Sequence, residues 1–411
     1  MSRPYSTPHV EELASQGLQL KQFYVPTAVC SSSRSSLLSG CYAARHRVFG
    51  AHGPGGRGLD TKFINIAEML RLAGYATAHF GKWHAGDQPE TRPTARGFDY
   101  SSGLMISNDM WRFNPVWASG VGKAPLPYWE NGEIVIKDVT PHDQKYLTRW
   151  ATDDASSFIR KHKDQPFFLY LAHSMPHVPL YCSEDFLGMS GVGLYGDVMM
   201  EIDWSVGQIT EALRQAGVER DTIVLFSSDN GPWDEYGNHS GKTPFREHKG
   251  TSFDGGTRSA TVIKYPAKLK AGRVLHRPMS TIDILPTLAY LTGAELPDYE
   301  IDGKNMWPVL SGDDQVPHPH KYYNFEYSRR LEAVLTSDGR WKLHLPHPYR
   351  HVLEEGHDSR RGKVTTHRID WALFDLETDP GETTNVMDQY PEITQRLKAY
   401  AEMRRKEFDL K

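Results

Sequence analysis

The first three quarters of the chain alternate short apolar runs with longer amphipathic stretches. Short runs rich in apolar residues, as is typical of buried strands, occupy residues 75–80, 166–172, 222–228 and 257–266. Stretches with apolar side chains at helical spacing lie between or before them, at residues 66–74, 145–163 and 205–217. This alternation predicts an α/β fold in which helices sandwich a mostly parallel sheet.

The pattern changes near residue 310. Residues 311–320 read SGDDQVPHPH, and this density of turn-forming residues and prolines predicts a domain boundary. Strand-like segments at the spacing of antiparallel hairpins follow, at residues 321–327, 332–338 and 340–345. Residues 391–410 predict a closing helix. We therefore predict a larger domain over residues 1–312 and a smaller α+β subdomain, built on a short antiparallel sheet, over residues 313–411.

The composition argues against several classes of partner. The 411 residues carry a net charge of −4, which gives no sign of a nucleic-acid or anionic-membrane partner. The longest apolar runs are far shorter than a membrane span. The 3 cysteines cannot build a disulfide framework, and the polar first residues show no signal segment, so the sequence leaves the compartment open.

Ionisable and amide side chains follow three of the predicted strands. They are Lys82 and His84, His173 and His177, and Asp229 and Asn230, and Lys249 stands in a later loop that contains glycine. Taken singly, each could belong to a solvated loop or an ordinary turn. Because the reactive groups of open α/β sheets gather at the carboxyl ends of strands, we expect these side chains to lie close together.

A further candidate lies in residues 28–40, which read AVCSSSRSSLLSG. This stretch places Cys30 among serines, with Arg34 four positions later. We interpret it as an accessible polar turn that presents Cys30 for chemistry. The alternative is that Cys30 serves as a small buried hydrophobic side chain, which is the commonest role of a free cysteine.

Together the candidates form a coherent chemical set. Several of them carry or could carry positive charge, namely Arg34, Lys82, His177 and Lys249. With a hard divalent cation, such groups would stabilise a tetrahedral oxyanion, sulfate or phosphate, during its transfer. Asp229 and Asn230 offer the oxygen ligands that Ca²⁺ or Mg²⁺ prefers. No cysteine–histidine cluster has zinc spacing, and the sequence contains no phosphate-binding glycine loop.

Several motifs extend this set over nearly the whole chain. They are CSSSR (30–34), LLSG (37–40), GYATAHFGKWHAG (74–86), RGFD (96–99), PHVP (176–179), SSDNGP (227–232) and KGTSFDGGTR (249–258). As a set they resemble the type I sulfatases, the formylglycine-dependent group of the alkaline phosphatase superfamily. Within that family the chain is most similar to the arylsulfatase A and N-acetylgalactosamine-6-sulfatase type.

This resemblance implies an alkaline phosphatase-like fold and a sulfuric ester hydrolase that acts on a sulfated sugar or a small sulfate ester. It also implies that a formylglycine-generating enzyme oxidises Cys30 to formylglycine, whose hydrated form supplies the nucleophile. Arg34 and Lys82 would hold and polarise that group. His84 would be the base that takes its proton when the sulfate is expelled.

The resemblance assigns roles to the remaining candidates as well. His177 and Lys249 would grip the sulfate and help to protonate the leaving oxygen. Asp229 and Asn230, together with the formylglycine at Cys30, would ligate a divalent cation, usually Ca²⁺, with Mg²⁺ as the alternative. Most relatives are periplasmic, secreted or lysosomal, and this is the location that the resemblance implies.

Two features depart from the family pattern. Ser32 stands where the motif most often has proline or alanine, in the stretch that the converting enzyme reads. The family also begins with a central strand that ends in two aspartates, and residues 6–30 resemble the segment after that strand. We therefore expect residues 1–312 to be a sulfatase catalytic domain that lacks its N-terminal strand and half of its metal site.

The sequence leaves other functions open. One is a phosphonate monoester or phosphodiester hydrolase of the same superfamily, which can use the same formylglycine. Another is an N-terminally truncated, catalytically inactive relative that only binds sugars. Three tryptophans, Trp111, Trp117 and Trp233, could stack on a sugar ring or simply pack within the structure.

Overall fold

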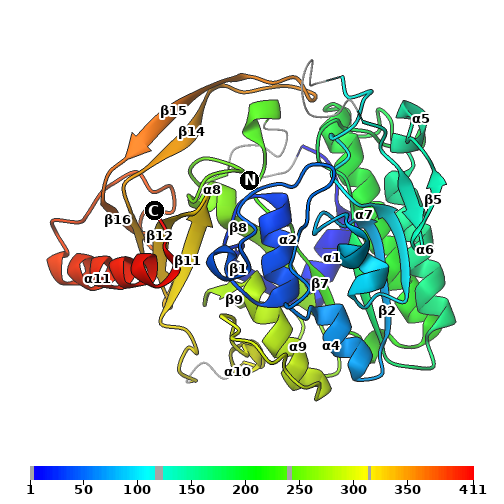
Figure 1. Cartoon of the computed structure of the whole chain (residues 1–411), viewed down its shortest axis with the longest axis horizontal. Helices are drawn as coiled ribbons and strands as arrows, with labels where there is room; N and C mark the ends of the chain where they lie inside the picture. The colour runs from blue at the N-terminus through cyan, green and yellow to red at the C-terminus, as the bar shows by residue number, and fades with distance from the viewer. Residues whose placement is uncertain (1–3, 116–123, 238–242, 313–315) are drawn as a thin grey trace.

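Two mixed sheets, the helices that cover them and a smaller C-terminal sheet make up the structure (Figure 1). The computed structural model describes residues 4–115, 124–237, 243–312 and 316–411. The predicted α/β class and the smaller antiparallel C-terminal unit are confirmed. The domain boundary that we predicted after residue 312 falls at residues 313–315, which lie outside the described residues. No helix in the described parts of the chain is long and apolar enough to cross a membrane.

The first large sheet has the order β10–β1–β8–β7, and β9 also pairs with β1. Its strands are β1 (Leu18–Tyr24), β7 (Val224–Phe226), β8 (Arg258–Lys264), β9 (Arg273–Leu275) and β10 (Met279–Ser280). β1 runs parallel to β9 and β10 but antiparallel to β8, and β8 is antiparallel to β7. The sequence did not predict β1, whose apolar residues are interrupted by Gln19, Lys21 and Gln22.

The second large sheet has the order β5–β4–β3–β2–β6. Its strands are β2 (Ala76–Lys82), β3 (Tyr100–Leu104), β4 (Tyr128–Glu130), β5 (Glu133–Ile136) and β6 (Phe167–Ala172). β2 is parallel to both of its neighbours, β3 and β6, whereas β4 and β5 add antiparallel pairs at one edge. Antiparallel edge strands on an otherwise parallel sheet are common in α/β folds.

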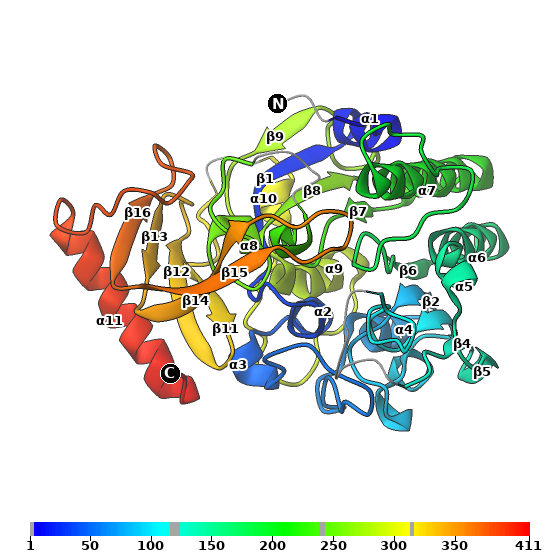
Figure 2. The same cartoon turned by 90° about the horizontal axis from the view of Figure 1, so that it is seen from above.

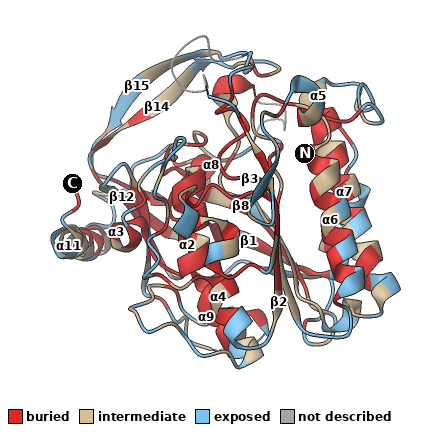
Figure 3. Ribbon diagram, turned by 45° about the vertical axis from the view of Figure 1, so that its right-hand side comes forward, coloured by how far each residue is buried: buried red, intermediate tan, exposed pale blue. Residues whose placement is uncertain are grey.

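Helices cover both faces of these sheets (Figure 3). On one side lie α6 (Leu147–Lys161) and α7 (Leu194–Ala216), and on the other lie α2 (Cys30–Ser39), α4 (Ile66–Leu72) and α9 (Ile284–Thr292). α6 buries Ala151, Ala155 and Phe158, at helical spacing, against Ala78 and Phe80 of β2. The predicted helix at residues 205–217 is the C-terminal half of α7.

Residues 28–40 do not form the accessible polar turn that we expected. Most of them form α2, which begins at Cys30 and ends before Gly40, a residue with φ 69° that caps the helix in the left-handed region. Every residue of α2 except Leu37 is buried. The prediction failed because serines disfavour helix interiors in isolation, whereas here tertiary burial against both sheets decides the conformation.

The two large sheets meet at their edge strands. β6 is the last strand of one sheet and β7 the last strand of the other, and among the described residues no strand pairs with their free edges. Their side chains contribute to the same apolar clusters: Phe168 of β6 with Leu225 of β7, and Leu169 with Val224. Figure 2 shows the two strands next to each other with α7 beside them. An edge of this kind presents unpaired backbone groups that another strand can bind.

The C-terminal unit is an antiparallel sheet of order β11–β12–β13–β16, backed by α11 (Pro391–Phe408). The strands are β11 (Tyr322–Tyr327), β12 (Arg330–Thr336), β13 (Trp341–His344) and β16 (Ala372–Asp375). Leu397 and Ala401 of α11 pack on Leu331 and Leu343 of this sheet. A separate hairpin, β14 (His347–Glu354) with β15 (Lys363–Ile369), arches from this unit over the larger part of the molecule (Figure 1).

A buried ionic cluster joins the C-terminal unit to the larger one. The Lys342 ammonium of β13 lies 2.8 Å from a carboxylate oxygen of Asp254, the first residue of α8 (Asp254–Thr257), and 3.2 Å from one of Glu382. All three side chains are fully buried. The other Glu382 oxygen accepts a hydrogen bond from the Asp254 backbone N–H at 2.7 Å. Two buried carboxylates therefore share one buried ammonium, and Arg258 also pairs with Asp254 while His344 donates to Glu382.

Removal of that ammonium tests how far the cluster holds the two units together. We expect Lys342→Ala to destabilise the protein by about 3 kcal/mol, because two buried carboxylates lose their shared ammonium. Asp254 keeps its ion pair with Arg258 and Glu382 its hydrogen bond with His344, which places the loss at the lower end for a broken buried pair. The measurement is the urea midpoint, with Lys406→Ala on the exposed side of α11 as the matched control. An unchanged midpoint for Lys342→Ala would show that the cluster contributes little.

Candidate active site

Cys30 is the first residue of α2, and residues 25–29 connect it to the carboxyl end of β1. Its side chain is buried, and Val29 before it is extended, with φ −147° and ψ 136°. The first backbone N–H groups of a helix carry a partial positive charge, which favours an anion at this position. The local fold therefore places Cys30 where a negatively charged atom is stabilised.

Cationic side chains from other elements surround the Cys30 sulfur. The Lys249 ammonium donates to Sγ at 3.4 Å, and the sulfur lies 3.9 Å from the Asn230 side-chain oxygen. Burial alone would raise the pKa of the Cys30 thiol, but the charges of Lys249 and Lys82 and hydrogen bonds with His177 and His84 hold that pKa well below its ordinary value.

The other two cysteines show the opposite behaviour. Cys41 and Cys182 are also buried and free, and burial, followed by nearby carboxylates, raises the pKa of each thiol to about 12. Cys30 is thus set apart from them by its charged surroundings, and it does not fit the alternative of a small buried hydrophobic side chain. The cations of this polar pocket favour the thiolate form of Cys30.

Arg34 lies one turn along α2 from Cys30 and links several elements. Its Nε donates to Asp229 at 2.9 Å, and its Nη1 donates to the backbone carbonyl of Lys82 at 2.6 Å and to the Tyr170 hydroxyl at 3.4 Å. Burial opposes the charge on Arg34, but Tyr170, Asp229 and Cys30 raise the pKa of its guanidinium above the ordinary value. Arg34 therefore stays charged and fixes the end of β2, the middle of β6 and the segment after β7 relative to α2.

Lys82 and His84 lie at the carboxyl end of β2. The Lys82 ammonium donates to the Ser107 hydroxyl at 3.1 Å, and burial, with a contribution from Arg34, lowers its pKa. His84 adopts φ 55°, a left-handed conformation that is uncommon outside glycine. Its Nε2 lies 2.9 Å from the His52 carbonyl oxygen, which identifies Nε2 as the protonated nitrogen.

Because Nε2 of His84 carries the proton, the other ring nitrogen, Nδ1, has a free lone pair. Its Nδ1 is buried and has no hydrogen-bond partner in the described structure. Burial, followed by the charge of Lys82, lowers the pKa of the imidazole and keeps it neutral. His84 also contributes to the lowered pKa of Cys30, so this neutral ring lies beside the nucleophile position.

His177 and Lys249 line another side of the site, together with Trp233. The His177 and Trp233 rings are 5.3 Å apart, and the Lys249 ammonium lies 4.2 Å from the centre of the Trp233 ring. His177 donates from Nδ1 to the Val178 carbonyl at 2.7 Å, and Nδ1 lies 3.8 Å from an Asp109 carboxylate oxygen. Backbone hydrogen bonds from Lys249 to Pro232 and from the next residue to Ala28 fix the Lys249 loop.

Asp229 and Asn230 follow β7, as predicted, and reach the same centre. One Asp229 oxygen is paired with Arg34, and the Asn230 side-chain amide donates to the Gly231 carbonyl at 3.0 Å. No group of three or more histidine, cysteine, aspartate or glutamate side chains arranged to hold a metal occurs in the described residues. Ca²⁺ takes six to eight oxygen ligands, so these residues supply only part of a calcium site.

The structure thus brings eight predicted residues to one centre: Cys30, Arg34, Lys82, His84, His177, Asp229, Asn230 and Lys249. His173, also singled out from the sequence, points elsewhere, and its Nε2 lies 3.0 Å from the Ser205 hydroxyl of α7. Trp111 is buried in an apolar cluster behind β3 and β4, and Trp117 lies outside the described residues.

Sequence reasoning missed several polar groups of the site. Ser107 receives the Lys82 ammonium, Asp109 lies beside His177, and Tyr170 contacts Arg34. Ser107 and Asp109 follow β3, and the rule that functional groups gather at the carboxyl ends of strands would have found them had β3 been predicted. Tyr170 lies inside an apolar strand, where its hydroxyl gives no signal in the sequence.

Fold and site together define a hydrolase centre for an ester of a tetrahedral oxyanion, and comparison with known proteins specifies the family. The sulfatase family model matches residues 1–294. Bovine (Bos taurus) arylsulfatase A is 33% identical over 410 residues, which cover 94% of this chain and 80% of that protein. The N-acetylgalactosamine-6-O-sulfatase of Bacteroides thetaiotaomicron is 30% identical over 465 residues, which cover 95% of this chain and 87% of that protein.

A solved structure agrees with these relatives. The crystal structure of Ps i-CgsB in complex with k-i-k-neocarrahexaose has a TM-score of 0.80 and 25% identity, covering 98% of this chain and 88% of that one. The chain belongs to the sulfatase family. It is an enzyme of the sulfuric ester hydrolase class and has the alkaline phosphatase-like fold of that family.

The charge environment of Cys30 can be tested on unconverted protein. We expect a single thiolate at neutral pH, because the pKa of Cys30 lies well below its ordinary value while those of Cys41 and Cys182 are raised to about 12. The measurement is ultraviolet thiolate absorbance as a function of pH. Cys30→Ser should abolish the neutral-pH signal, and Lys249→Met should move its midpoint to higher pH. A midpoint near that of free cysteine would contradict this reading of the site.

Proposed function

We propose that this enzyme hydrolyses a sulfate ester of a carbohydrate through a formylglycine formed from Cys30. The observation that carries the proposal is the Cys30 sulfur, buried at a helix N-terminus with Lys249 at 3.4 Å and with Lys82, His84 and His177 acting on it. The relatives support the substrate class, since one is an N-acetylgalactosamine-6-O-sulfatase and one solved structure holds k-i-k-neocarrahexaose.

The residues around Cys30 fit a formylglycine. They present hydrogen-bond donors from Lys249 and a free acceptor at His84 Nδ1, which suits a group with two hydroxyls in one small polar pocket. When present, hydrated formylglycine supplies one hydroxyl that attacks sulfur and a second that allows sulfate to be expelled. A formylglycine-generating enzyme would be the partner in maturation, acting on Cys30 with Ser32 in the recognised stretch.

Arg34 and Lys82 hold the nucleophile position and keep it polarised. Both are buried, and Arg34 is fixed by Asp229 and by the Lys82 carbonyl. Because their charges are oriented before substrate binds, stabilising negative charge at residue 30 requires little reorganisation. Ser107 orients the Lys82 ammonium through its hydroxyl.

His84 is the base of this proposal. Its Nε2–H donates to the His52 carbonyl, which leaves the Nδ1 lone pair directed into the site, and its lowered pKa keeps the ring neutral. A neutral imidazole with one free lone pair can take a proton from a hydroxyl at residue 30. His177 and Lys249, on the other side, donate to the sulfate oxygens and to the leaving oxygen of the sugar.

The cation needs more ligands than the described residues supply. Asp229 is already paired with Arg34, and Asn230 adds one oxygen, so this set does not by itself fit Ca²⁺. Among the described residues the outer edges of β6 and β7 pair with no other strand, and Asp229 and Asn230 follow β7. A strand between them that ended in carboxylates would bring those carboxylates to Asp229.

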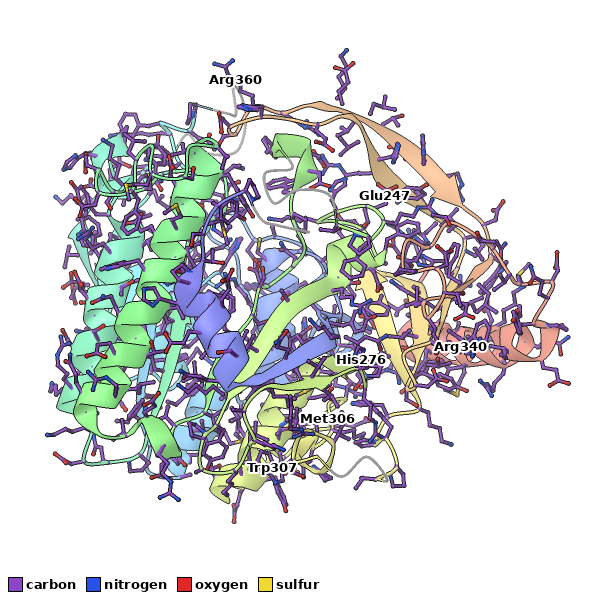
Figure 4. All side chains as sticks on the ribbon, turned by 180° about the vertical axis from the view of Figure 1, so that it is seen from behind. Glu247, His276, Met306, Trp307, Arg340 and Arg360 are labelled. Atoms are coloured by element: carbon purple, nitrogen blue, oxygen red, sulfur yellow. The ribbon has the colours of Figure 1, made fainter. Side chains whose placement is uncertain are left out.

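Selectivity between ester classes tests the proposed function directly. We expect the matured enzyme to turn over an aryl sulfate faster than the matching aryl phosphodiester, because the relatives are sulfuric ester hydrolases. Cys30→Ala should abolish both activities, whereas His276→Ala, at an exposed position directly after β9, should change neither (Figure 4). A clear preference for the diester would instead identify a phosphonate monoester or phosphodiester hydrolase.

The role of His84 gives a second prediction. We expect His84→Gln to lower kcat about 10²–10⁴-fold, because it removes the base while keeping a hydrogen bond to the His52 carbonyl available. Steady-state kinetics with an aryl sulfate provide the measurement, and His276→Gln is the matched control. A kcat within about threefold of the starting enzyme would rule His84 out as the base.

The incomplete ligand set predicts weak metal binding. We expect the chain of 411 residues to bind Ca²⁺ with a Kd above roughly 10⁻³ M. Asp229 and Asn230 supply few oxygen ligands, and one carboxylate oxygen of Asp229 is already paired with Arg34. Isothermal titration, with Asp229→Ala as control, measures this affinity. Binding in the micromolar range that Asp229→Ala abolished would show that a complete site exists in this chain.

A further inference from the structure

We propose that the cavity beneath the β14–β15 hairpin is a carbohydrate subsite for an uncharged sugar next to the sulfated one. This inference rests on the proposed function and adds to it the class of substrate: an oligosaccharide whose neighbouring residue carries no charge. The argument comes from the size of the cavity, its unpartnered polar groups and its position beside the catalytic centre.

The cavity lies between the hairpin and the segment that precedes α8. It has a volume of about 720 Å³, within the range of sites that hold small ligands. Tyr349, His351 and His367 line it from the hairpin, and Arg246 to His248 line it from the opposite segment. Figure 4 shows Glu247 beneath the hairpin.

Two polar side chains of the cavity have unmet hydrogen bonds. His248 is 1% exposed, and neither of its ring nitrogens has a partner in the described structure. Burial lowers the pKa of His248 to about 4, so the ring is neutral and offers one donor and one acceptor. Asp234, which also lines the cavity, has an unpartnered buried carboxylate oxygen. Buried groups of this kind ordinarily have partners, and a hydroxyl both donates and accepts.

The roof of the cavity offers ring surfaces for a sugar. The imidazoles of His351 and His367 stack at 4.4 Å with an angle of 18° between their planes, and Tyr349 lies 5.8 Å from His367. His351 Nδ1 hydrogen-bonds to Glu247 at 2.9 Å, which connects the hairpin to the opposite wall. A pyranose ring has an apolar face that packs on flat rings and hydroxyl groups that form hydrogen bonds. The two walls of the cavity therefore complement such a ring.

The charges of the cavity favour a neutral ligand. Asp234, Glu247 and Glu355 line it, and burial, followed by Glu355 and Glu247, raises the pKa of Asp234 to about 7. The Arg246 guanidinium also lines the cavity, where it lies 3.8 Å from Glu247 and donates to the Glu382 carbonyl and the Tyr349 hydroxyl, so Asp234 and Glu355 remain as the excess carboxylates. A second sulfate or a uronate carboxylate would therefore meet an excess of carboxylates. A sugar that bears only hydroxyl or N-acetyl groups would not.

The cavity adjoins the proposed catalytic centre. Asp234 and His248 line the cavity, and their neighbours in the sequence, Trp233 and Lys249, belong to the catalytic centre. There the Lys249 ammonium lies 4.2 Å from the centre of the Trp233 ring. Consecutive Cα atoms are only about 3.8 Å apart. The cavity wall and the residues assigned to the sulfate are therefore consecutive along the chain, and on this proposal the rest of the glycan extends from Lys249 into the cavity.

The test compares kcat/KM of matured enzyme on matched substrates. The probes are sulfated monosaccharides (galactose, fucose, N-acetylgalactosamine and N-acetylglucosamine sulfates) and oligosaccharides that join the same sulfated sugar to galactose or to glucuronate. An aryl sulfate provides the reference for catalysis. We expect the galactose-linked oligosaccharide to exceed both the monosaccharide and the glucuronate-linked form by about tenfold in kcat/KM.

Variants assign that preference to the cavity. His351→Ala/His367→Ala should lower the ratio of oligosaccharide to aryl sulfate kcat/KM about tenfold, and His276→Ala, an exposed histidine on another face, should leave the ratio unchanged. Leu353→Ala, at a 60% exposed position that lines the cavity, supplies a second variant in which folding is not at risk.

The outcomes separate this inference from the proposed function. If the aryl sulfate is hydrolysed but oligosaccharides show no advantage, or if glucuronate-linked ones are preferred, the subsite inference is wrong and the proposed function stands. An advantage that survives in both cavity variants also overturns the inference. If no sulfate ester is hydrolysed by protein shown to carry the aldehyde, the proposed function itself fails.

Discussion

The rest of the site depends on the hydrogen bonds that the Arg34 guanidinium makes. It reaches from α2 to the Asp229 carboxylate after β7, to the Lys82 carbonyl at the end of β2 and to the Tyr170 hydroxyl of β6. Those contacts join the two large sheets, whose edge strands β6 and β7 are not paired with each other. Because the guanidinium is planar and carries donors in fixed directions, one side chain can set three elements at once. The position of Cys30, one helical turn away, follows from it.

The charges around Cys30 explain why this centre suits an anionic group. Lys82, Lys249 and Arg34 converge on a buried position with Asp229 as a counter-charge, so positive charge prevails where an ester oxyanion would lie. The C-terminal unit takes part in this arrangement at a distance. Lys342 and Glu382 bind Asp254 in the buried ionic cluster, and Asp254 follows the Lys249 loop by a few residues. Catalytic geometry and the packing of the two units are therefore linked.

Much of the site could be predicted from the sequence because its residues follow strands. Lys82, Asp229 and Asn230 each come directly at or after an apolar run, and the ends of such strands converge by topology. The conformation of residues 28–40 could not be predicted, since a serine-rich segment has low helix propensity and is helical here because tertiary contacts bury it. The hairpin β14–β15 was missed for another reason. Its strands are rich in histidine and charge and lie half exposed, so no alternation of apolar and polar residues marks them.

The most direct test of this account is the mass of the tryptic peptide that contains residue 30, which spans residues 22–34. The protein should come from a host that has a formylglycine-generating enzyme, and the motif with Ser32 should be left as it stands. The account predicts an aldehyde at residue 30 in place of the thiol, in protein that hydrolyses an aryl sulfate. An unmodified thiol in protein that still hydrolyses the ester would contradict it, because the proposed chemistry needs the hydrated aldehyde at that position.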